Sequence, residues 1–392
     1  MTKIYLIRHA EAEGNLYRRA QGQFNSNLTA LGRTQLKALA ERFRDVRLDA
    51  LWSSDLNRTQ STAAAIRKYH PELPLHTWDR LREIDVGVWE DVPWGNIAED
   101  YPEQMDHFTN DPARWSVPGG EPYEHVQARM KAAVLELGAR YEGGTIAVVS
   151  HGLCIRSFLC GIFGIPSSEI GRLPYGDNTS VSLVTVEGGT ARVEWYNDNS
   201  HLTGADLSTF SRQSWWRRAD QPARKIYSRF APMDPRAERD LYDRCYAETW
   251  RQSHGNLRGY APAVYLRSAE QHVRRDPRCL RKLYLGETFC GIVELDPDRG
   301  KEDGAGWISL LYLEPAMRGR RLGSQLVGHA VSVFRREGRR CLRLHVSQDN
   351  ETAVGFYRHT GFRAVEECRG VGGMLYLMEM DIVPRVLTPQ DI

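Results

Sequence analysis

The chain has 392 residues, of which 41% are hydrophobic and 26% charged, and its formal net charge at pH 7 is +2. This length suits two domains better than one, and the composition is that of an ordinary globular protein. The small net charge does not indicate a nucleic-acid partner, and no apolar run approaches the roughly 20 residues of a transmembrane helix, so we expect no membrane association.

The seven cysteines have neither metal-type nor disulfide-type spacing. Reduced thiols are therefore expected, as in a cytoplasmic protein. The first residues enter a strand directly and show no signal-peptide pattern, which agrees with a cytoplasmic location.

Charge is divided unevenly along the chain. Residues 1–205 hold 21 Lys/Arg and 26 Asp/Glu, a net charge of −5, whereas residues 206–392 hold 31 and 24, a net charge of +7. This difference favours two separate units. The basic half is explained either by a solvated, arginine-rich face or by attraction of an anionic ligand, and composition alone leaves both open.

Strands and helices alternate along the first half. Strands are predicted over 3–8, 48–53 and 145–152, and helices after the cap residue Thr29, from about 55, and over 124–141. This order predicts a mainly parallel sheet with helices on both faces. Ligands bind beyond the carboxyl ends of such strands, where His9 and His151 are expected to lie.

A cationic pocket is expected at this edge of the sheet. Arg8, His9 and His151 follow strands, and Arg58 lies in the first turn of a helix. Arginine forks and a helix N-terminus suit a dianion, most simply a phosphoryl group. A neutral His9 in such a pocket is a candidate nucleophile, and Glu83, with other acids nearby, is a candidate proton donor for the leaving alkoxide.

Four segments in order, "RHAEAEGN", "SSDLNRTQSTA", "LREIDVGVWE" and "VVSHG", resemble the histidine phosphatase (phosphoglycerate mutase-like) superfamily. The resemblance covers residues 1–204 and implies a three-layer α/β/α domain. It implies that His9 becomes phosphorylated, that Arg8, Arg58 and His151 bind the phosphate, and that Glu83 is the acid. No metal is expected, because these cations supply the positive field.

The same resemblance implies that Asn15, Gln21 and Gly22 line the substrate pocket. Several motif positions depart from the usual residues, and they leave the organic part of the substrate open; they are Ala10, Ala12, Gly14, Asn25 and Asn27. The unit lacks the extra segments of most family members that act as mutases. Hydrolysis of a phosphomonoester is therefore favoured, with a mutase as the alternative.

A linker is expected at 205–224 and a second domain at 225–383. A helix is predicted over 234–255 with Asp234 as its cap, followed by two antiparallel strands within 281–295 that turn at Gly286–Glu287. A strand over 306–315, a basic glycine-bearing loop at 318–323, an amphipathic helix, a further strand and a short helix ending at Gly361 follow. The loop and the helix after it form a cradle suited to a pyrophosphate.

"LYLEPAMRGRRLGSQLV" and "VSQDNETAVGFYRHTGF" resemble the GNAT acetyltransferase superfamily, an α/β acyl-CoA N-acyltransferase fold. The resemblance implies acetyl-CoA as the cofactor and Tyr357 as the acid that protonates the departing thiolate. It implies a cofactor site built from Arg318, Gly319, Arg320, Arg321, Leu322, Gly323 and Asn350. Arg321 stands where glycine is usual, and a positive φ there would cost about 1 kcal/mol or more. No catalytic base is assigned.

The sequence thus predicts a bifunctional α/β enzyme, a phosphatase joined to an acetyltransferase, acting on a small phosphomonoester and an amine. Two alternatives stay open. The first domain is a mutase, or the second only binds coenzyme A or supports a homodimer.

Overall fold

The computed structural model of the chain describes residues 1–204, 206–212 and 227–392. Two compact units are present. The first is Met1–Val92, Ile97–Lys225 and Pro384–Ile392, and the second is Pro93–Asn96 and Ile226–Val383. The expected linker at 205–224 lies for the most part outside the described residues. Within the described ranges, no helix combines the length and apolar character needed to cross a membrane.

A six-stranded sheet forms the centre of the first unit, in the order β3-β2-β4-β1-β5-β6. The first four strands are parallel, and the last two are antiparallel, so the prediction of a mainly parallel sheet is confirmed. The strands are β1 (Thr2–Arg8), β2 (Ala50–Ser53), β3 (Leu75–Thr77), β4 (Thr145–Ser150), β5 (Val181–Glu187) and β6 (Thr190–Asp198).

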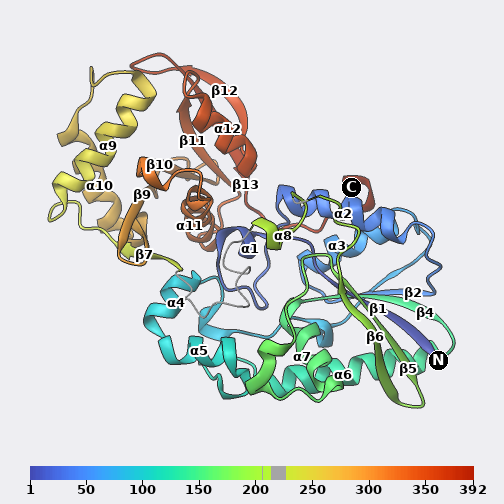
Figure 1. Cartoon of the computed structure of the whole chain (residues 1–392). Helices are drawn as coiled ribbons and strands as arrows, with labels where there is room; N and C mark the ends of the chain where they lie inside the picture. The colour runs from blue at the N-terminus through green and yellow to red at the C-terminus, as the bar shows by residue number, and fades with distance from the viewer. Residues whose placement is uncertain (205, 213–226) are drawn as a thin grey trace. The chain divides into compact units, whose positions relative to one another are not determined.

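Helices cover both faces of this sheet, as predicted (Figure 1). α2 and α3 pack together on one face, and α6 and α7 pack together on the other. Thr29 caps α2 as expected, because its Oγ1 accepts the Gly32 N–H at 3.0 Å. The helices up to residue 212 are α1 (Glu13–Tyr17), α2 (Ala30–Phe43), α3 (Asn57–Arg67), α4 (Trp94–Asp100), α5 (Pro102–Asn110), α6 (Tyr123–Arg140), α7 (Gly152–Phe163) and α8 (Thr209–Arg212).

The central strand β1 decides where the site lies. Ile4, Leu6 and Ile7 have no exposed surface, as befits a strand covered on both faces. β1 pairs with β4 in a register that places Arg8 opposite Ser150. The two strands therefore end side by side, and the residues that follow them are His9 and His151.

The second unit contains a seven-stranded sheet in the order β12-β13-β11-β10-β9-β8-β7, in which only the β10–β11 pair is parallel. α9 and α10 cover one face, and α11 and α12 cover the other (Figure 1). The helices are α9 (Arg239–His254), α10 (Pro262–Arg275), α11 (Leu322–Arg336) and α12 (Glu351–Thr360). The strands are β7 (Ser228–Pro232), β8 (Leu280–Leu285), β9 (Thr288–Asp296), β10 (Ala305–Leu313), β11 (Cys341–Ser347), β12 (Arg363–Arg369) and β13 (Met374–Asp381).

Most expected elements of this unit are present. The β8–β9 hairpin and the end of α12 at Gly361 are confirmed. The helix predicted over 234–255 begins instead at Arg239, because the Asp234 carboxylate accepts two backbone N–H groups of a separate turn, from Arg236 and Ala237. α10, β7, β12 and β13 were not predicted.

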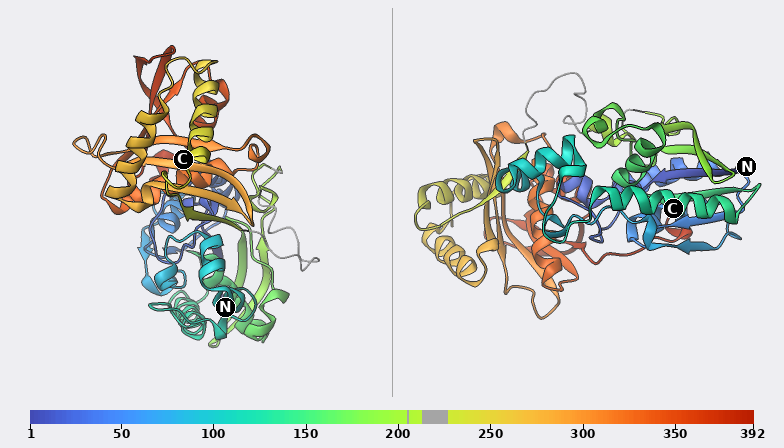
Figure 2. Two further views of the ribbon diagram at one scale, coloured as in Figure 1. Left: turned by 90° about the vertical axis from the view of Figure 1, so that its left-hand side faces the viewer. Right: turned by 90° about the horizontal axis from the view of Figure 1, so that it is seen from below.

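The segment Pro384–Ile392 returns to the first unit after the second is complete. Leu387 is buried in the core of the first unit, and its backbone N–H donates to Ser61 Oγ at 2.9 Å. The N–H of Arg385 donates to Asn27 Oδ1 at 2.9 Å. The right-hand view of Figure 2 shows this red segment among the blue elements.

Leu387→Ala should lower the free energy of unfolding of the first unit by about 2 kcal/mol or more, because it leaves a cavity beside α3. The readout is hydrogen exchange of the α3 amides. Val386→Ala is the matched control, since Val386 is exposed and should change stability by less than about 0.5 kcal/mol. Equal exchange in both variants would contradict the packing role of the segment.

Candidate functional site

His9 lies at the carboxyl end of β1 and is almost fully buried. Its backbone N–H donates to the Ser150 carbonyl at 3.0 Å, and its Nδ1 lies 2.7 Å from the Ala10 carbonyl oxygen. A carbonyl only accepts, so Nδ1 carries the proton. The neutral ring therefore has its lone pair on Nε2.

The surroundings of His9 keep its ring neutral. Burial, followed by the positive charges of Arg58 and Arg8, lowers the pKa of His9 well below its usual value. An unprotonated nitrogen is thus held in a cationic environment, which is the state that a nucleophile toward a phosphoryl group requires.

Arg58, in the first turn of α3, is the most deeply buried cation of the site at 1% exposure. Its two terminal nitrogens donate to the carbonyls of Gly22 at 2.6 Å and Phe24 at 3.1 Å. Its Nε has no hydrogen-bond partner among the described residues. Burial lowers the pKa of Arg58 to about 10, so the guanidinium stays charged at neutral pH.

Glu90 shapes the loop that receives Arg58. Its carboxylate accepts the backbone N–H groups of Gly22 at 3.2 Å, Gln23 at 2.6 Å and Phe24 at 3.1 Å. These bonds turn the loop carbonyls toward the guanidinium. This role of Glu90 was not predicted, because a carboxylate 68 positions from Gly22 carries no local signal of it.

His151 is the residue that precedes α7. Its Nε2 lies 2.7 Å from Ser54 Oγ, its Nδ1 has no hydrogen-bond partner within the described part of the chain, and its ring centroid lies 5.3 Å from that of His9. Burial and the charge of Arg58 lower the pKa of His151 well below its usual value. His9, Arg58 and His151 are thus brought together as expected.

The carboxyl group of Glu83 lies at the N-terminus of α7. Its Oε2 accepts the Leu153 N–H at 3.0 Å, and its Oε1 accepts the N–H groups of Cys154 at 2.9 Å and Ile84 at 3.1 Å. Other acids were expected beside Glu83, but its carboxyl oxygens accept backbone N–H groups instead. Three of its four lone-pair positions are used, and the fourth is on Oε2, which is therefore the atom able to hold a proton.

Arg8 and two unpredicted residues complete this edge of the sheet. One terminal nitrogen of Arg8 donates to the Gly176 carbonyl at 2.6 Å, which directs the guanidinium along the strand ends. The amide of Asn178 donates to the His9 carbonyl at 2.9 Å and lies 3.5 Å from Asn15 Oδ1. Asn178 thus fixes the backbone of His9.

The three expected substrate-pocket residues lie in the segment after β1. Asn15 Oδ1 also accepts the Ala12 N–H at 3.1 Å, so this side chain stabilises the start of α1. The amide of Gln21 donates to Ser26 Oγ. Gly22 is close-packed, and a Cβ there would lie 2.3 Å from the Ile84 carbonyl oxygen.

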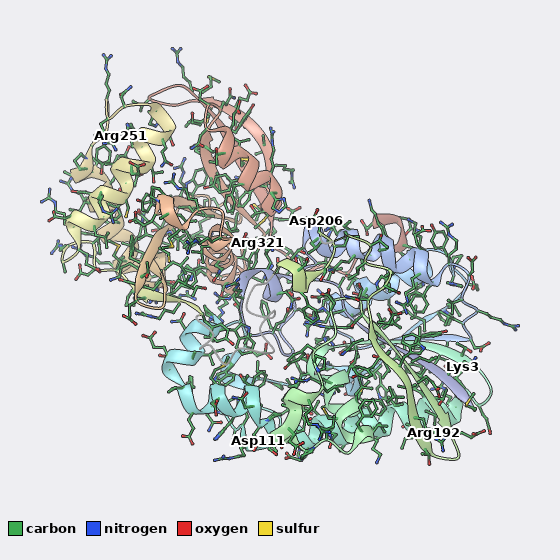
Figure 3. The ribbon with its side chains drawn as sticks, viewed as in Figure 1. Lys3, Asp111, Arg192, Asp206, Arg251 and Arg321 are labelled. Atoms are coloured by element: carbon green, nitrogen blue, oxygen red, sulfur yellow. The ribbon has the colours of Figure 1, made fainter. Side chains whose placement is uncertain are left out.

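The second expected site is the loop before α11. Gly319 has φ +73°, and Arg321, labelled in Figure 3, has φ +61° and directly precedes the helix. The left-handed conformation suspected at Arg321 is therefore present. The side chain of Arg321 does not cap α11, and a helix N-terminus of this kind suits an anion. A Cβ at Gly323 would lie 2.9 Å from the Phe356 ring.

Arg318 and the two residues assigned after the loop have structural contacts of their own. The Arg318 guanidinium donates to the Leu313 carbonyl at 3.0 and 3.1 Å. Asn350 caps α12, since its Oδ1 accepts the Ala353 N–H at 3.1 Å. Tyr357 packs against Phe362, and burial raises its pKa, so its hydroxyl is protonated at neutral pH. Arg320 and Leu322 complete the loop and the first turn.

Family models match both halves of the chain. The histidine phosphatase superfamily (branch 1) matches residues 4–199, and the acetyltransferase (GNAT) family matches residues 237–362. Across the described residues, no group of three or more His, Cys, Asp or Glu side chains is arranged to hold a metal ion.

Curated relatives align with the first half. Phosphoserine phosphatase 1 of Hydrogenobacter thermophilus is 34% identical over 188 residues, which are 48% of this chain and 88% of that protein. A protein of an Enterobacter species named "Probable phosphoglycerate mutase GpmB" is 31% identical over 217 residues, 54% of this chain and all of that protein. The solved structure of Bacillus stearothermophilus YhfR is 34% identical with a TM-score of 0.50, covering 51% of this chain and 99% of its own.

The state of His9 is open to a direct test by ¹⁵N NMR. Its ring should remain the neutral Nδ1–H tautomer as the pH falls from 8 through about 6.5, because folding lowers its pKa. The unfolded chain then binds the proton more readily than the folded one, so this group reduces the stability of the first unit as the pH falls below about 6.5. The His9 signals are assigned by their loss in His9→Asn, and a titration midpoint near 6.5 in the folded protein would contradict this account.

Proposed function

This chain belongs to the histidine phosphatase superfamily and also carries a GNAT acetyltransferase domain, and we propose on that premise that it is a bifunctional enzyme. The first unit hydrolyses a phosphomonoester through a phosphohistidine, and the second transfers an acetyl group to an amine. The observation that carries the first activity is the bond from His9 Nδ1–H to the Ala10 carbonyl, which leaves Nε2 as the nucleophile.

In the first step, His9 Nε2 forms a bond to phosphorus as the bond from phosphorus to the ester oxygen breaks. Arg8, Arg58 and His151 surround the transferring oxygens, and the buried polar atoms Arg58 Nε and His151 Nδ1 suit them as donors. The leaving alkoxide takes a proton from Glu83 Oε2. Water then attacks phosphorus, the N–P bond breaks, and Glu83 takes the proton of that water, so that phosphate leaves and His9 is restored.

A mutase is the second candidate, favoured by the 31% identity to the GpmB protein over its full length. A mutase returns the phosphoryl group from histidine to another hydroxyl of the same molecule. A phosphatase releases inorganic phosphate, whereas a mutase forms an isomeric phosphomonoester, so the products distinguish the two activities. The compact first unit, which has no added segments, favours hydrolysis.

The N-terminus of α11 supports a coenzyme A site in the second unit. Its uncapped N–H groups, with Gly319 and Arg321 in left-handed conformations before it, suit a pyrophosphate. Acetyl-CoA supplies the acetyl group. The acceptor ammonium first loses one proton to solvent. Its nitrogen then forms a bond to the acetyl carbon as the thioester C–S bond breaks. Tyr357 gives its proton to the departing thiolate and is restored by the second proton of the amine. All seven cysteines are free thiols, which supports the cytoplasm as the compartment.

Glu83→Gln tests the acid. Hydrolysis of an alkyl phosphate, whose alkoxide is a poor leaving group, should slow by roughly 10²–10⁴-fold, whereas hydrolysis of p-nitrophenyl phosphate should slow much less, because the phenolate leaves without a proton. Initial rates of phosphate release measure both.

Two variants complete this test. Glu142→Gln changes an exposed carboxylate after α6 and should leave both rates unchanged. His9→Ala should abolish both. Equal losses for the two substrates in Glu83→Gln would assign Glu83 a purely structural role at α7.

Acetyl-CoA should raise the melting temperature of the second unit in the full chain, because it binds the folded state. Gly323→Asp should remove this effect, since it adds a negative charge to the first turn of α11, next to the proposed pyrophosphate site. Gly323→Ala is the control, because it introduces the same approach to Phe356 without the charge.

Loss of the cofactor effect in both variants would mean that packing at Phe356, rather than the added charge, prevents binding.

Arg321→Gly tests whether Arg321 binds the phosphate or is merely tolerated in the loop. An unchanged affinity with a higher melting temperature means that the arginine is tolerated, and a clear loss of affinity means that it binds the phosphate. No shift in the unmodified chain at millimolar acetyl-CoA would refute the cofactor.

A further inference from the structure

The second unit contains a cavity of about 360 Å³ that is open to solvent and lined in part by residues of α9 and α10. β10 and β11 pair only from Ala305 to Trp307 and from Cys341 to Arg343, although both strands continue. Beyond these pairs the strands diverge. Ser309 on β10 and Ser347 on β11 both line the cavity, which therefore reaches the gap between the strands.

One wall of the cavity is aromatic. The rings of Tyr246 and Tyr265 stack with centroids 4.2 Å apart. The ring centroid of Trp250 lies 5.7 Å from that of Tyr265. Trp307 contributes a fourth ring from β10. These rings come from two helices and a strand, and their faces suit a flat apolar group.

A charged cluster forms the inner end. His272 Nδ1 lies 2.8 Å from Glu294 Oε1, and its Nε2 lies 3.5 Å from Asp296 Oδ2. Burial alone would lower the pKa of His272, but the two carboxylates outweigh it and raise this pKa to about 9. Two carboxylates and one imidazolium leave one net negative charge, which suits an ammonium group.

Arg299 lies at the rim. Its guanidinium carbon is 3.5 Å from the centre of the Trp307 ring, and no carboxylate of the described residues lies within ion-pair distance of it. Stacking on the indole occupies the face of the guanidinium and leaves the N–H groups of its edge for a carboxylate. The backbone N–H of Arg299 donates to Asp296 Oδ1 at 3.0 Å, so the rim cation and the inner cluster are neighbours.

We propose that this cavity binds a free α-amino acid with an aromatic side chain as the acetyl acceptor. Its ammonium faces Glu294 and Asp296, its carboxylate pairs with Arg299, and its side chain lies against Tyr246 and Tyr265. A negative inner cluster beside a positive rim matches an amine and a carboxylate on one carbon. The role of this amino acid as acetyl acceptor rests on the proposed acetyl transfer. Its binding in the cavity does not.

Calorimetry on the full chain tests the binding directly with three probes: L-phenylalanine, phenethylamine, which lacks the carboxylate, and 3-phenylpropionate, which lacks the amine. Phenylalanine should bind at least tenfold more tightly than either. Arg299→Met should lower the affinity for phenylalanine at least tenfold and leave the affinity for phenethylamine unchanged. Arg267→Met, at an exposed arginine on α10, is the matched control and should change neither.

Asp296→Asn tests the other end of the ligand. It should lower the affinity for phenylalanine and phenethylamine and leave the affinity for 3-phenylpropionate unchanged. A general loss of folding would lower all three affinities. Phenethylamine binding as tightly as phenylalanine, or no binding of any probe, would overturn the proposal. Binding of phenylalanine without release of thiol from acetyl-CoA would uphold the site and refute the transferase activity, so the two failures are distinguishable.

Discussion

The attachment of Glu83 to the N-terminus of α7 is the interaction on which the first site depends. Its carboxyl group accepts the N–H groups of Leu153 and Cys154 and so joins the segment after β3 to the helix that follows His151. Because this helix end is occupied by a protein carboxylate, its N–H groups are not open to an external anion. The cap fixes Glu83, whereas Arg58 is held by the carbonyls of Gly22 and Phe24, and Arg8 by that of Gly176.

The second unit uses the same physical element in the opposite way. The side chain of Arg321, the residue before α11, does not cap the helix, and its backbone is in a left-handed conformation. The N-terminus of α11 therefore lacks the kind of carboxylate cap that Glu83 provides to α7.

Local patterns predicted β1, β2 and β4 with α2, α3 and α6, and the residues at the strand ends, whereas β3, β5, β6 and the other helices of the first unit were not predicted. Apolar runs identified β1 and β4, and the polar residues that follow them, His9 and His151, were placed correctly beside each other. The partners that hold these residues were not predicted. Glu90 and Asn178 act on backbone atoms 68 and 169 positions away, and such pairs exist only once the sheet has formed.

The helix α10 was not predicted, although its apolar residues lie on one face. Ala269 is buried, and Leu266 and Val273 pack against the core beside it. Tyr265 and His272 on the same helix also line the cavity. Periodicity indicates which face of a helix is buried, and it does not indicate that part of this face surrounds a ligand site.

The return of Pro384–Ile392 to the first unit has a consequence for the order in which the chain is made. Domains generally fold as they leave the ribosome, the earlier one first. Here the core around α3 includes Leu387, which is synthesised only after the whole second unit. The core of the first unit therefore stays incompletely packed while more than a hundred later residues are synthesised. A ribosome that stops early would release a first unit that lacks part of its core and leaves exposed the apolar surface that Leu387 covers.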